Sequence, residues 1–215
     1  MGTAGKSELM TTLRPGAGML RQTAKLTVQG VSVLLAWPFA ALAGFGRFRA
    51  GFDTCAHVFA LLPGLAGDYM RVAFYAMTLE SCALNSRISF GTFFATPHAR
   101  VGAGVYIGQY GQFGYCIIGD RSQIASHVQI LSGGRQHGRD PNGRILGSEP
   151  GNFPSVAIGH DCWLGAAAIV MADVGPGTTV GAGAVVTRPV PPGVTAVGNP
   201  ARPLPPAATR TEPPA

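Results

Sequence analysis

The sequence predicts a mainly β fold in which a parallel β-helix follows an apolar helical region. Three observations carry this prediction. Of the 31 glycines, 21 lie within residues 88–199, and an aliphatic residue recurs every six positions in the same stretch. Charged residues make up 12% of the chain and hydrophobic residues 47%, a composition that is too apolar and too weakly charged for a disordered protein.

The six-residue period is the strongest signal. It is clearest at five aliphatic residues separated by six, eleven, six and six positions: Val101, Ile107, Ile118, Ile124 and Ile130. Helices repeat every 3.6 residues and strands every two, so neither alone produces this period. Hexads are typical of β-helices, in which short strands and tight turns stack coil on coil. About ten hexads, three to a triangular coil, predict a little over three coils, with Ile88 and Phe94 as irregular openers.

The chain before the repeat is expected to form an arm followed by apolar helices. Residues 1–25 are expected to be a flexible arm, and residues 26–46 carry no charge. As a helix, this second stretch is long enough to cross the hydrocarbon core of a bilayer, about 30 Å thick. Pro38 in its middle predicts a kink or a break, and Arg47 and Arg49 follow it directly.

A further helix is expected over residues 69–83, with Asp68 as its N-terminal cap. Two interpretations of residues 26–83 stay open. One is a helical cap over the open end of the β-helix, which a solenoid requires; the other is a membrane-associated region whose basic flanks suit an anionic cytoplasmic leaflet. The predicted organisation is an N-terminal arm with apolar helices (1–87), a β-helix (88–204) with a non-repeating insert (132–155), and a disordered tail (205–215).

The sequence IGHDCWLGAAAIVMADVGPGTTVGAGAVVTRPVPPGVTAVGNPARPL, at residues 158–204, resembles the C-terminal half of bacterial hexapeptide-repeat acyltransferases. The tryptophan coil, the VGAGAVV coil and the GNPAR ending carry the resemblance, which extends over residues 88–204. It implies a left-handed parallel β-helix and a homotrimer. It also implies an acyl-CoA, such as acetyl-CoA, as a co-substrate that is not permanently bound, and no metal site.

Acyl transfer from a thioester needs a base to take the proton of the attacking group, and histidine suits this because its pKa lies near working pH. The resemblance implies that the base lies in or just after the coil that precedes a long excursion. In this chain that residue is His137, inside the insert. Related sugar acetyltransferases show I-L-T-x-x-H at this point, whereas two more residues precede the histidine here. His127, in the preceding coil, is the alternative base or a substrate ligand.

Other polar residues give weaker signals. His98, in TPHARVG, resembles the start of the first coil of serine acetyltransferases, but the aspartate of their D-I-H-P is absent, so a surface turn is expected. A catalytic histidine is usually oriented by a carboxylate or a carbonyl. Asp140, Glu149 and Asp120 all stay open as that partner.

Coenzyme A has a largely apolar pantetheine arm and an anionic nucleotide end, and the resemblance implies that the arm lies along stacked coils of adjacent subunits. Small residues allow such an arm to approach backbone amides, and arginines can hold phosphates through charge-assisted hydrogen bonds. Gly165 is further implied as a backbone donor to the oxyanion. The implied cofactor-binding residues are Trp163, Gly165, Ala166, Gly181, Ala182, Arg188, Asn199 and Arg202.

These features together predict an O-acetyltransferase that acts on a sugar or a lipid-linked glycan at the cytoplasmic face of the inner membrane. Four cysteines without C-x-x-C spacing suit a reducing cytosol. The net charge of +6 includes no basic block interleaved with aromatics, so no nucleic-acid partner is expected. Two alternatives stay open: a non-catalytic trimeric scaffold, and a zinc carbonic anhydrase of the same fold, although His127 and His137 do not match the close histidine pair of those enzymes.

Overall fold

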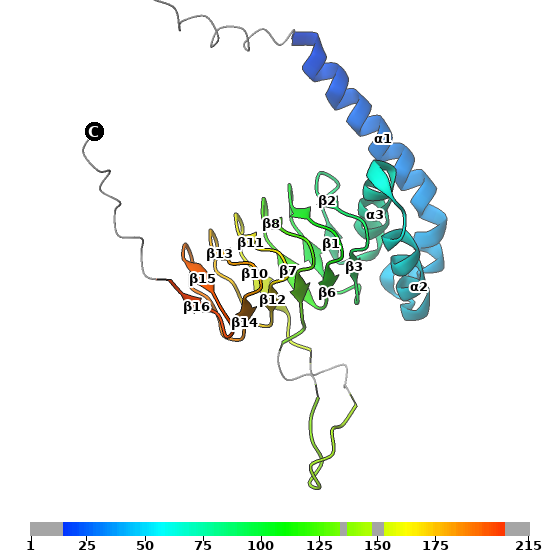
Figure 1. The fold of residues 1–215 in the computed structure, drawn as a ribbon. Helices are drawn as coiled ribbons and strands as arrows, with labels where there is room; N and C mark the ends of the chain where they lie inside the picture. Colours follow the sequence, from blue (N-terminus) through cyan, green and yellow to red (C-terminus); the bar gives the residue numbers. More distant parts are fainter. Residues whose placement is uncertain (1–14, 134–136, 148–152, 205–215) are drawn as a thin grey trace, which may run out of the picture.

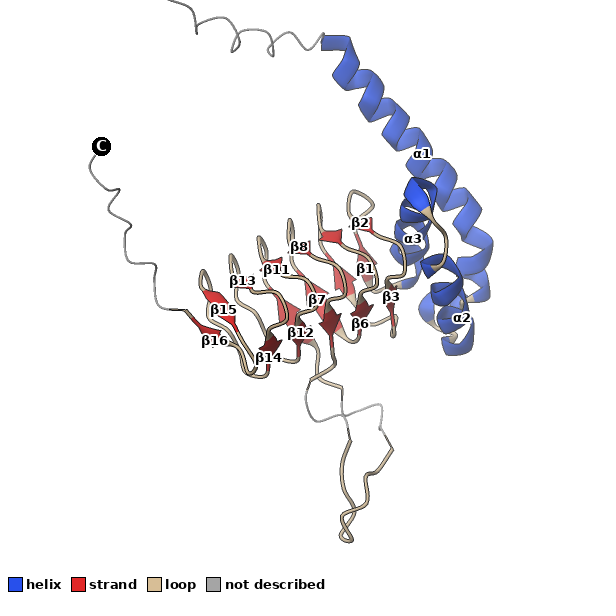
Figure 2. Ribbon diagram, viewed as in Figure 1, coloured by secondary structure: helices blue, strands red, loops and turns tan. Residues whose placement is uncertain are grey.

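A helical region leads into a triangular solenoid of short strands in the computed structural model, which describes residues 15–133, 137–147 and 153–204 (Figure 1). Figure 2 shows the helices gathered at one end of the strand stack. The helical elements are α1 (Pro15–Leu42), the short 3-10 helix η2 (Gly44–Gly46), α2 (Arg49–Ala60) and α3 (Gly64–Thr78).

The strands form three parallel sheets, one for each side of the triangle. The first sheet contains β1 (Ser81–Cys82), β4 (Arg100–Val101), β7 (Cys116–Ile118) and β10 (Val156–Ile158). The second contains β2 (Arg87–Ile88), β5 (Tyr106–Ile107), β8 (Gln123–Ile124), β11 (Trp163–Leu164), β13 (Thr179–Val180) and β15 (Thr195–Val197), with β16 (Arg202–Pro203) antiparallel to β15. The third contains β3 (Phe93–Phe94), β6 (Gln112–Phe113), β9 (Gln129–Ile130), β12 (Ile169–Val170) and β14 (Val185–Val186).

Turns between the sheets form three corners that run along the solenoid. The first corner joins the first sheet to the second and includes residues 102–105, 119–122 and 159–162. The second corner joins the second sheet to the third and includes residues 108–111, 125–128, 165–168 and 181–184. The third corner joins the third sheet back to the first, through residues 95–99 and 114–115 and through residue 131 with the insert 132–155.

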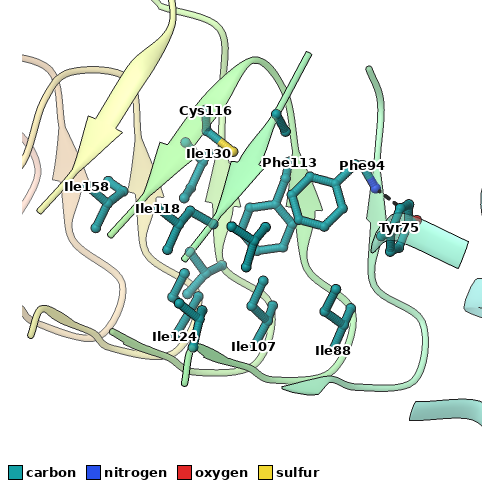
Figure 3. Packing of buried hydrophobic residues seen from close by; sticks show 14 of the residues in the cluster. Tyr75, Ile88, Phe94, Ile107, Phe113, Cys116, Ile118, Ile124, Ile130 and Ile158 are labelled. Atoms are coloured by element: carbon teal, nitrogen blue, oxygen red, sulfur yellow. Dashed lines mark hydrogen bonds between the residues drawn. The ribbon is translucent and has the colours of Figure 1, made fainter. Parts of the chain in front are cut away.

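The hexad residues form the core, as the periodicity predicts. Equivalent positions of successive coils stack in register, for example Ile88 on Ile107 and Ile107 on Ile124 (Figure 3). All three of these side chains are fully buried. Each coil therefore buries its apolar face against the coils above and below it, which is how a solenoid is stabilised.

The expectation of a little over three coils is wrong, because the strands make about six turns. Phe94 pairs in register with Phe113, and both rings are fully buried. Aromatic side chains thus fill the inward position that the hexad pattern assigned to aliphatic ones, and the opening residues belong to a regular first coil. That coil begins at Ser81, ahead of the domain boundary expected at residue 88.

The helices cover the open end of the solenoid at its first coil. Helix α3 packs on β1 and β2, and the Tyr75 hydroxyl accepts a hydrogen bond from the Phe94 backbone N–H (3.2 Å; Figure 3). Burial raises the pKa of Tyr75 far above its usual range, so its hydroxyl stays protonated. The helical cap that a solenoid requires is thus present.

Several sequence-based expectations about the helices are wrong. Helix α1 begins at Pro15, so residues 15–25 are helical rather than part of a flexible arm, and Pro38 does not break the helix, which continues to Leu42. Helix α3 begins at Gly64 rather than at residue 69, so Asp68 lies inside the helix instead of capping it. Its carboxylate pairs with arginines, and that pairing explains the buried acidic side chain.

Gly119, on the first corner, is expected to tolerate no side chain. A Cβ atom there would lie 2.5 Å from the backbone nitrogen of His160 in the next coil. We expect Gly119→Ala to lower the free energy of unfolding by about 1–3 kcal/mol, the usual cost of overpacking, as measured by chemical denaturation. Gly147→Ala is the matched control, because open space surrounds that position; equal destabilisation by both variants would contradict the stacking argument.

Candidate active site

His137 lies on a hairpin of the insert that projects away from the coils (Figure 1). The hairpin is closed by a bridge between Arg139 and Ile145 and by a bond from the Leu146 N–H to the Gly138 carbonyl (2.9 Å). The His137 Nδ1 atom lies 3.1 Å from the Leu146 carbonyl oxygen. A carbonyl can only accept, so Nδ1 carries a proton, and in the neutral ring Nε2 presents its lone pair. This is the tautomer that a general base needs.

A carbonyl, rather than the Asp140 or the Asp120 carboxylate, orients the His137 ring among the described residues. The Asp140 carboxylate instead accepts from the backbone N–H groups of Asn142 and Arg144 (2.9 Å each) and so shapes the tip of the hairpin. Asp120 lies on the first corner, where it accepts from the Ala103 N–H (2.8 Å). Glu149 lies outside the described residues.

His127 lies on the second corner, away from the insert. Its backbone is left-handed (φ 62°), and its exposed ring stacks on Tyr110 with the ring centres 5.2 Å apart. Within the described part of the chain, no hydrogen bond fixes the orientation or the tautomer of this ring. The stacked ring is therefore less well prepared for proton transfer than His137.

The small residues implied for coenzyme A follow the same corner as His127. Gly165 and Gly181 allow close stacking: a Cβ on Gly165 would lie 2.5 Å from the Ala182 nitrogen. The Gly165 N–H donates to the Val180 carbonyl (2.7 Å), and the Gly181 N–H donates to the Ala196 carbonyl (2.8 Å). The Gly165 N–H therefore cannot also donate to an oxyanion, the role that the resemblance implies for it, because it is already bonded to the Val180 carbonyl.

Two neighbouring amides do remain available on this corner. The N–H groups of Ala166 and Ala182 have no hydrogen-bond partner among the residues that the structure describes. They lie in equivalent positions of consecutive coils, since Gly183 N–H bonds to the Ala166 carbonyl (2.8 Å). The second corner thus presents a line of small residues with exposed backbone donors. The backbone donors that this corner leaves open therefore belong to Ala166 and Ala182, each one residue after an implied glycine.

The remaining residues implied for the cofactor are spread over the surface. Trp163 lies on β11 and is 58% exposed. Asn199 follows β15 at the end of the second corner, and Arg202 lies on β16, where its guanidinium donates to the Ala201 carbonyl (2.9 Å). Arg188 lies on the third corner, like the insert. Within one chain, His137 and the small residues of the second corner therefore occupy different edges of the triangle.

The structure also forms a groove on the third corner that the sequence did not reveal. It has a volume of about 590 Å³ and lies at the foot of the insert, between Leu131 and Phe153. His98 lines it, and its Nδ1 lies 3.2 Å from the Glu80 carboxylate. Arg100 bonds the same carboxylate (2.8 Å), and Arg100 together with His98 lowers the pKa of Glu80. His98 lies on the expected turn, but its partner comes from a residue 18 positions earlier.

A second ionic cluster lies on the first corner. The Arg121 guanidinium bonds both carboxylate oxygens of Asp161 (2.7 and 2.6 Å), and the His160 Nδ1 lies 2.7 Å from the same group. These contacts, that with Arg121 first, lower the pKa of Asp161 to about 2. Over residues 15–133, 137–147 and 153–204, no group of three His, Cys, Asp or Glu side chains is placed to hold a metal ion.

Comparison with known proteins identifies the fold. No protein-family model matches the chain, and no curated protein matches its sequence. Among solved structures, a galactoside acetyltransferase in complex with coenzyme A is 21% identical over 73% of this chain and 78% of its own, with a TM-score of 0.61. A hexapeptide-repeat-containing acetyltransferase from Vibrio cholerae is 18% identical over 78% of this chain and 91% of its own, with a TM-score of 0.54.

A polysialic-acid-specific acetyltransferase, NeuO, is 25% identical over 56% of this chain, with a TM-score of 0.46; the chain spans 57% of its length. The galactoside acetyltransferase and the Vibrio cholerae protein, both with TM-scores above 0.5, show that the fold is that of solved hexapeptide-repeat acetyltransferases. The left-handed parallel β-helix expected from the sequence is confirmed.

Proposed function

We propose that the protein is an acyl-CoA-dependent O-acyltransferase that moves an acetyl group to a sugar hydroxyl, with His137 as the general base. The observation that carries the proposal is the contact between the His137 Nδ1 and the Leu146 carbonyl (3.1 Å), which leaves Nε2 ready to accept a proton. The similar structures support the choice of reaction, since one of them holds coenzyme A and is described as a galactoside acetyltransferase.

The proposed reaction is a direct transfer. His137 Nε2 takes the proton of the acceptor hydroxyl. At the same time the hydroxyl oxygen attacks the carbonyl carbon of the thioester, and a C–O bond forms. The carbonyl oxygen becomes an oxyanion, for which the Ala166 N–H is the available backbone donor. When the intermediate collapses, the C–S bond breaks, and the imidazolium returns the proton to the thiolate of coenzyme A. Proton transfer of this kind typically contributes 10²–10⁴-fold to the rate.

The proposed active unit is a homotrimer with sites between subunits. Two features support this. The hairpin that carries His137 points away from its own coils (Figure 1), and the donors of Ala166 and Ala182 lie on a different corner of the same chain. A neighbouring copy would supply the second corner that the hairpin lacks. In a closed rotationally symmetric ring, every such pairing is repeated at each interface.

We further propose that the helical region rests on the cytoplasmic leaflet of the inner membrane. Helix α1 buries a stripe of small and polar residues that includes Gln29, Ser32, Ala36 and Ala40. Its large apolar side chains point outward instead, and the exposed ones include Leu20, Leu26, Leu34, Leu35, Trp37 and Leu42. The segment Met19–Leu42 is also long and apolar enough to cross a membrane, by length and composition only.

Basic residues border this apolar surface. Lys25 lies on α1, while Arg47 and Arg49 lie where α2 begins. Apolar burial combined with cationic flanks is the usual basis of attachment to an anionic lipid surface. A glycan carried on a lipid would be an accessible acceptor there, at the face of the membrane where acetyl-CoA is present. Nucleic acid is not part of this proposal.

Membrane attachment is tested by charge placed on the outer face of α1. We expect the full-length protein to co-float with phosphatidylserine-containing vesicles. The double variant Leu34→Glu, Leu35→Glu should bind at least tenfold more weakly, because burying each leucine is worth about 1.5–3 kcal/mol and the glutamates add repulsion. Ile145→Glu is the matched control, since Ile145 is similarly exposed (65%) on the insert hairpin. A wild-type protein that stays with the soluble fraction would contradict the proposal.

A further inference from the structure

The groove on the third corner has the size and position of a ligand site. Three consecutive coils form its floor, through Thr96 and His98 in the first, Tyr115 in the second and Ser132 in the third. Arg49 of α2 and Phe153 at the end of the insert also line it. Its volume of about 590 Å³ falls within the range of small-molecule sites, about 300–1,000 Å³.

The polar groups of the groove are oriented and yet open to a ligand. The Glu80 carboxylate accepts a hydrogen bond from the His98 Nδ1–H, and in the neutral ring His98 Nε2 then presents a lone pair. The Tyr115 hydroxyl and the Gln112 side-chain amide have no hydrogen-bond partner in the described part of the chain. These groups offer both donors and acceptors, and the half-buried Tyr115 ring adds an apolar face.

The charges around the groove are already paired. Arg49 bonds both oxygens of the Asp53 carboxylate (3.0 and 2.9 Å), and Arg100 bonds Glu80. Little net charge is left to attract an ion. Neutral donors and acceptors beside aromatic rings instead suit a ligand with several hydroxyl groups on a compact ring.

We infer that this groove binds a pyranose ring of the acceptor, with His98 and Tyr115 as specificity-determining residues. The inference rests on the proposed acyl transfer for the identity of the ligand as an acceptor, but sugar binding itself does not depend on it. A hydroxyl of the ring donates to His98 Nε2 and accepts from Tyr115 or Gln112. A sugar held there lies at the foot of the insert that carries His137.

The groove lies next to the helical region that we propose to rest on the membrane. Arg49, at the α2 end of the groove, follows directly after Phe48, which is 58% exposed. Phe45 on η2 is exposed as well. The groove therefore reaches the start of α2 beside two exposed aromatic side chains. A glycan whose lipid lies in the bilayer can place its terminal sugars in the groove without leaving the membrane.

Saturation-transfer difference NMR on the full-length protein, without acyl-CoA, tests the inference. The probes are methyl glucoside, methyl galactoside and methyl N-acetylglucosaminide. We expect at least one to receive saturation from the wild-type protein, and the Kd to rise at least tenfold in His98→Ala and in Tyr115→Ala. His160→Ala is the matched control, because His160 is another exposed, carboxylate-paired histidine on a different corner. Tyr115→Phe keeps the ring, so its Kd for the glycoside should lie between those of the wild type and Tyr115→Ala. Because this variant removes only the hydroxyl, it separates loss of sugar binding from misfolding.

The inference is overturned if none of the three glycosides receives saturation, or if His98→Ala and Tyr115→Ala bind as the wild type does. Its failure is distinguishable from that of the proposed function. Sugar binding that persists in a protein without acetyl transfer supports the groove and contradicts the catalytic proposal. Acetyl transfer whose KM for the sugar is unchanged in both groove variants contradicts the groove alone.

Discussion

His137→Ala is expected to lower the turnover number of acetyl transfer by about 10²–10⁴-fold, while the affinity for acetyl-CoA stays the same. Removing the imidazole leaves no group to take the proton of the acceptor hydroxyl, whereas the proposed contacts to the cofactor come from the second corner. Turnover is followed by release of the coenzyme A thiol, and affinity by calorimetry. A fall in kcat with an unchanged Kd is the signature of an interaction made in the transition state.

Two histidine variants serve as controls for this experiment. His127→Ala should change kcat much less, because its ring has no oriented tautomer among the described residues. His160→Ala should change nothing, since that ring lies on the first corner beside Asp161. If His137→Ala retains full turnover and His127→Ala does not, the base is His127. If both variants retain full turnover, the base is another group; a wild-type protein that shows no turnover would instead be a scaffold.

Mixing two inactive variants tests whether the active site lies between subunits. We expect Ala182→Glu to block the cofactor surface on the second corner and to be inactive alone, like His137→Ala. When the two are unfolded and refolded together, some interfaces pair the intact hairpin of one copy with the intact corner of its neighbour. Partial recovery of activity in the mixture supports sites between subunits. Activity that never recovers in the mixture contradicts them.

Arg71→Ala is expected to cause the largest loss of stability of any single substitution in the helical region. Arg71 is fully buried, and its Nε donates to the Ile88 carbonyl of β2 (2.9 Å). One terminal nitrogen donates to the carbonyls of Phe59 (3.0 Å) and Leu62 (2.7 Å) at the end of α2. The other pairs with the Asp68 carboxylate (2.5 Å). Burial lowers the pKa of Arg71, and the contact with Asp68 opposes that shift.

Truncating this side chain leaves several buried carbonyls without a partner and leaves the Asp68 carboxylate with Arg87 (2.8 Å) as its remaining ionic partner. Breaking a buried ion pair typically costs about 3–5 kcal/mol, so the midpoint of chemical denaturation should fall sharply. Arg71→Lys should recover part of the loss, because an ammonium group has three donors but not the planar fork of a guanidinium. Arg121→Ala is the control: it removes an exposed pair (63% exposed arginine) and should leave the midpoint unchanged. Equal effects of Arg71→Ala and Arg121→Ala would contradict the argument.

The candidate site was predictable from the sequence only in part. The break in the hexad pattern pointed to the insert and to His137, since a repeat can be interrupted only where the chain leaves the coils. The partner of His137 was not predictable, because Leu146 approaches it only when the hairpin closes. The contact between His98 and Glu80 was not predictable either. The two residues are 18 positions apart and meet because the first coil winds once between them.

What the sequence by itself determined is the solenoid, its inward residues, the place of the insert and the apolar helical region. These follow from a local period and from composition, which each coil or helix expresses on its own. Only the tertiary structure decided how many coils form, which corner each polar group faces, and how Arg71 joins α2, α3 and the first coil. These depend on the winding and stacking of coils, which bring together residues that are distant in the sequence.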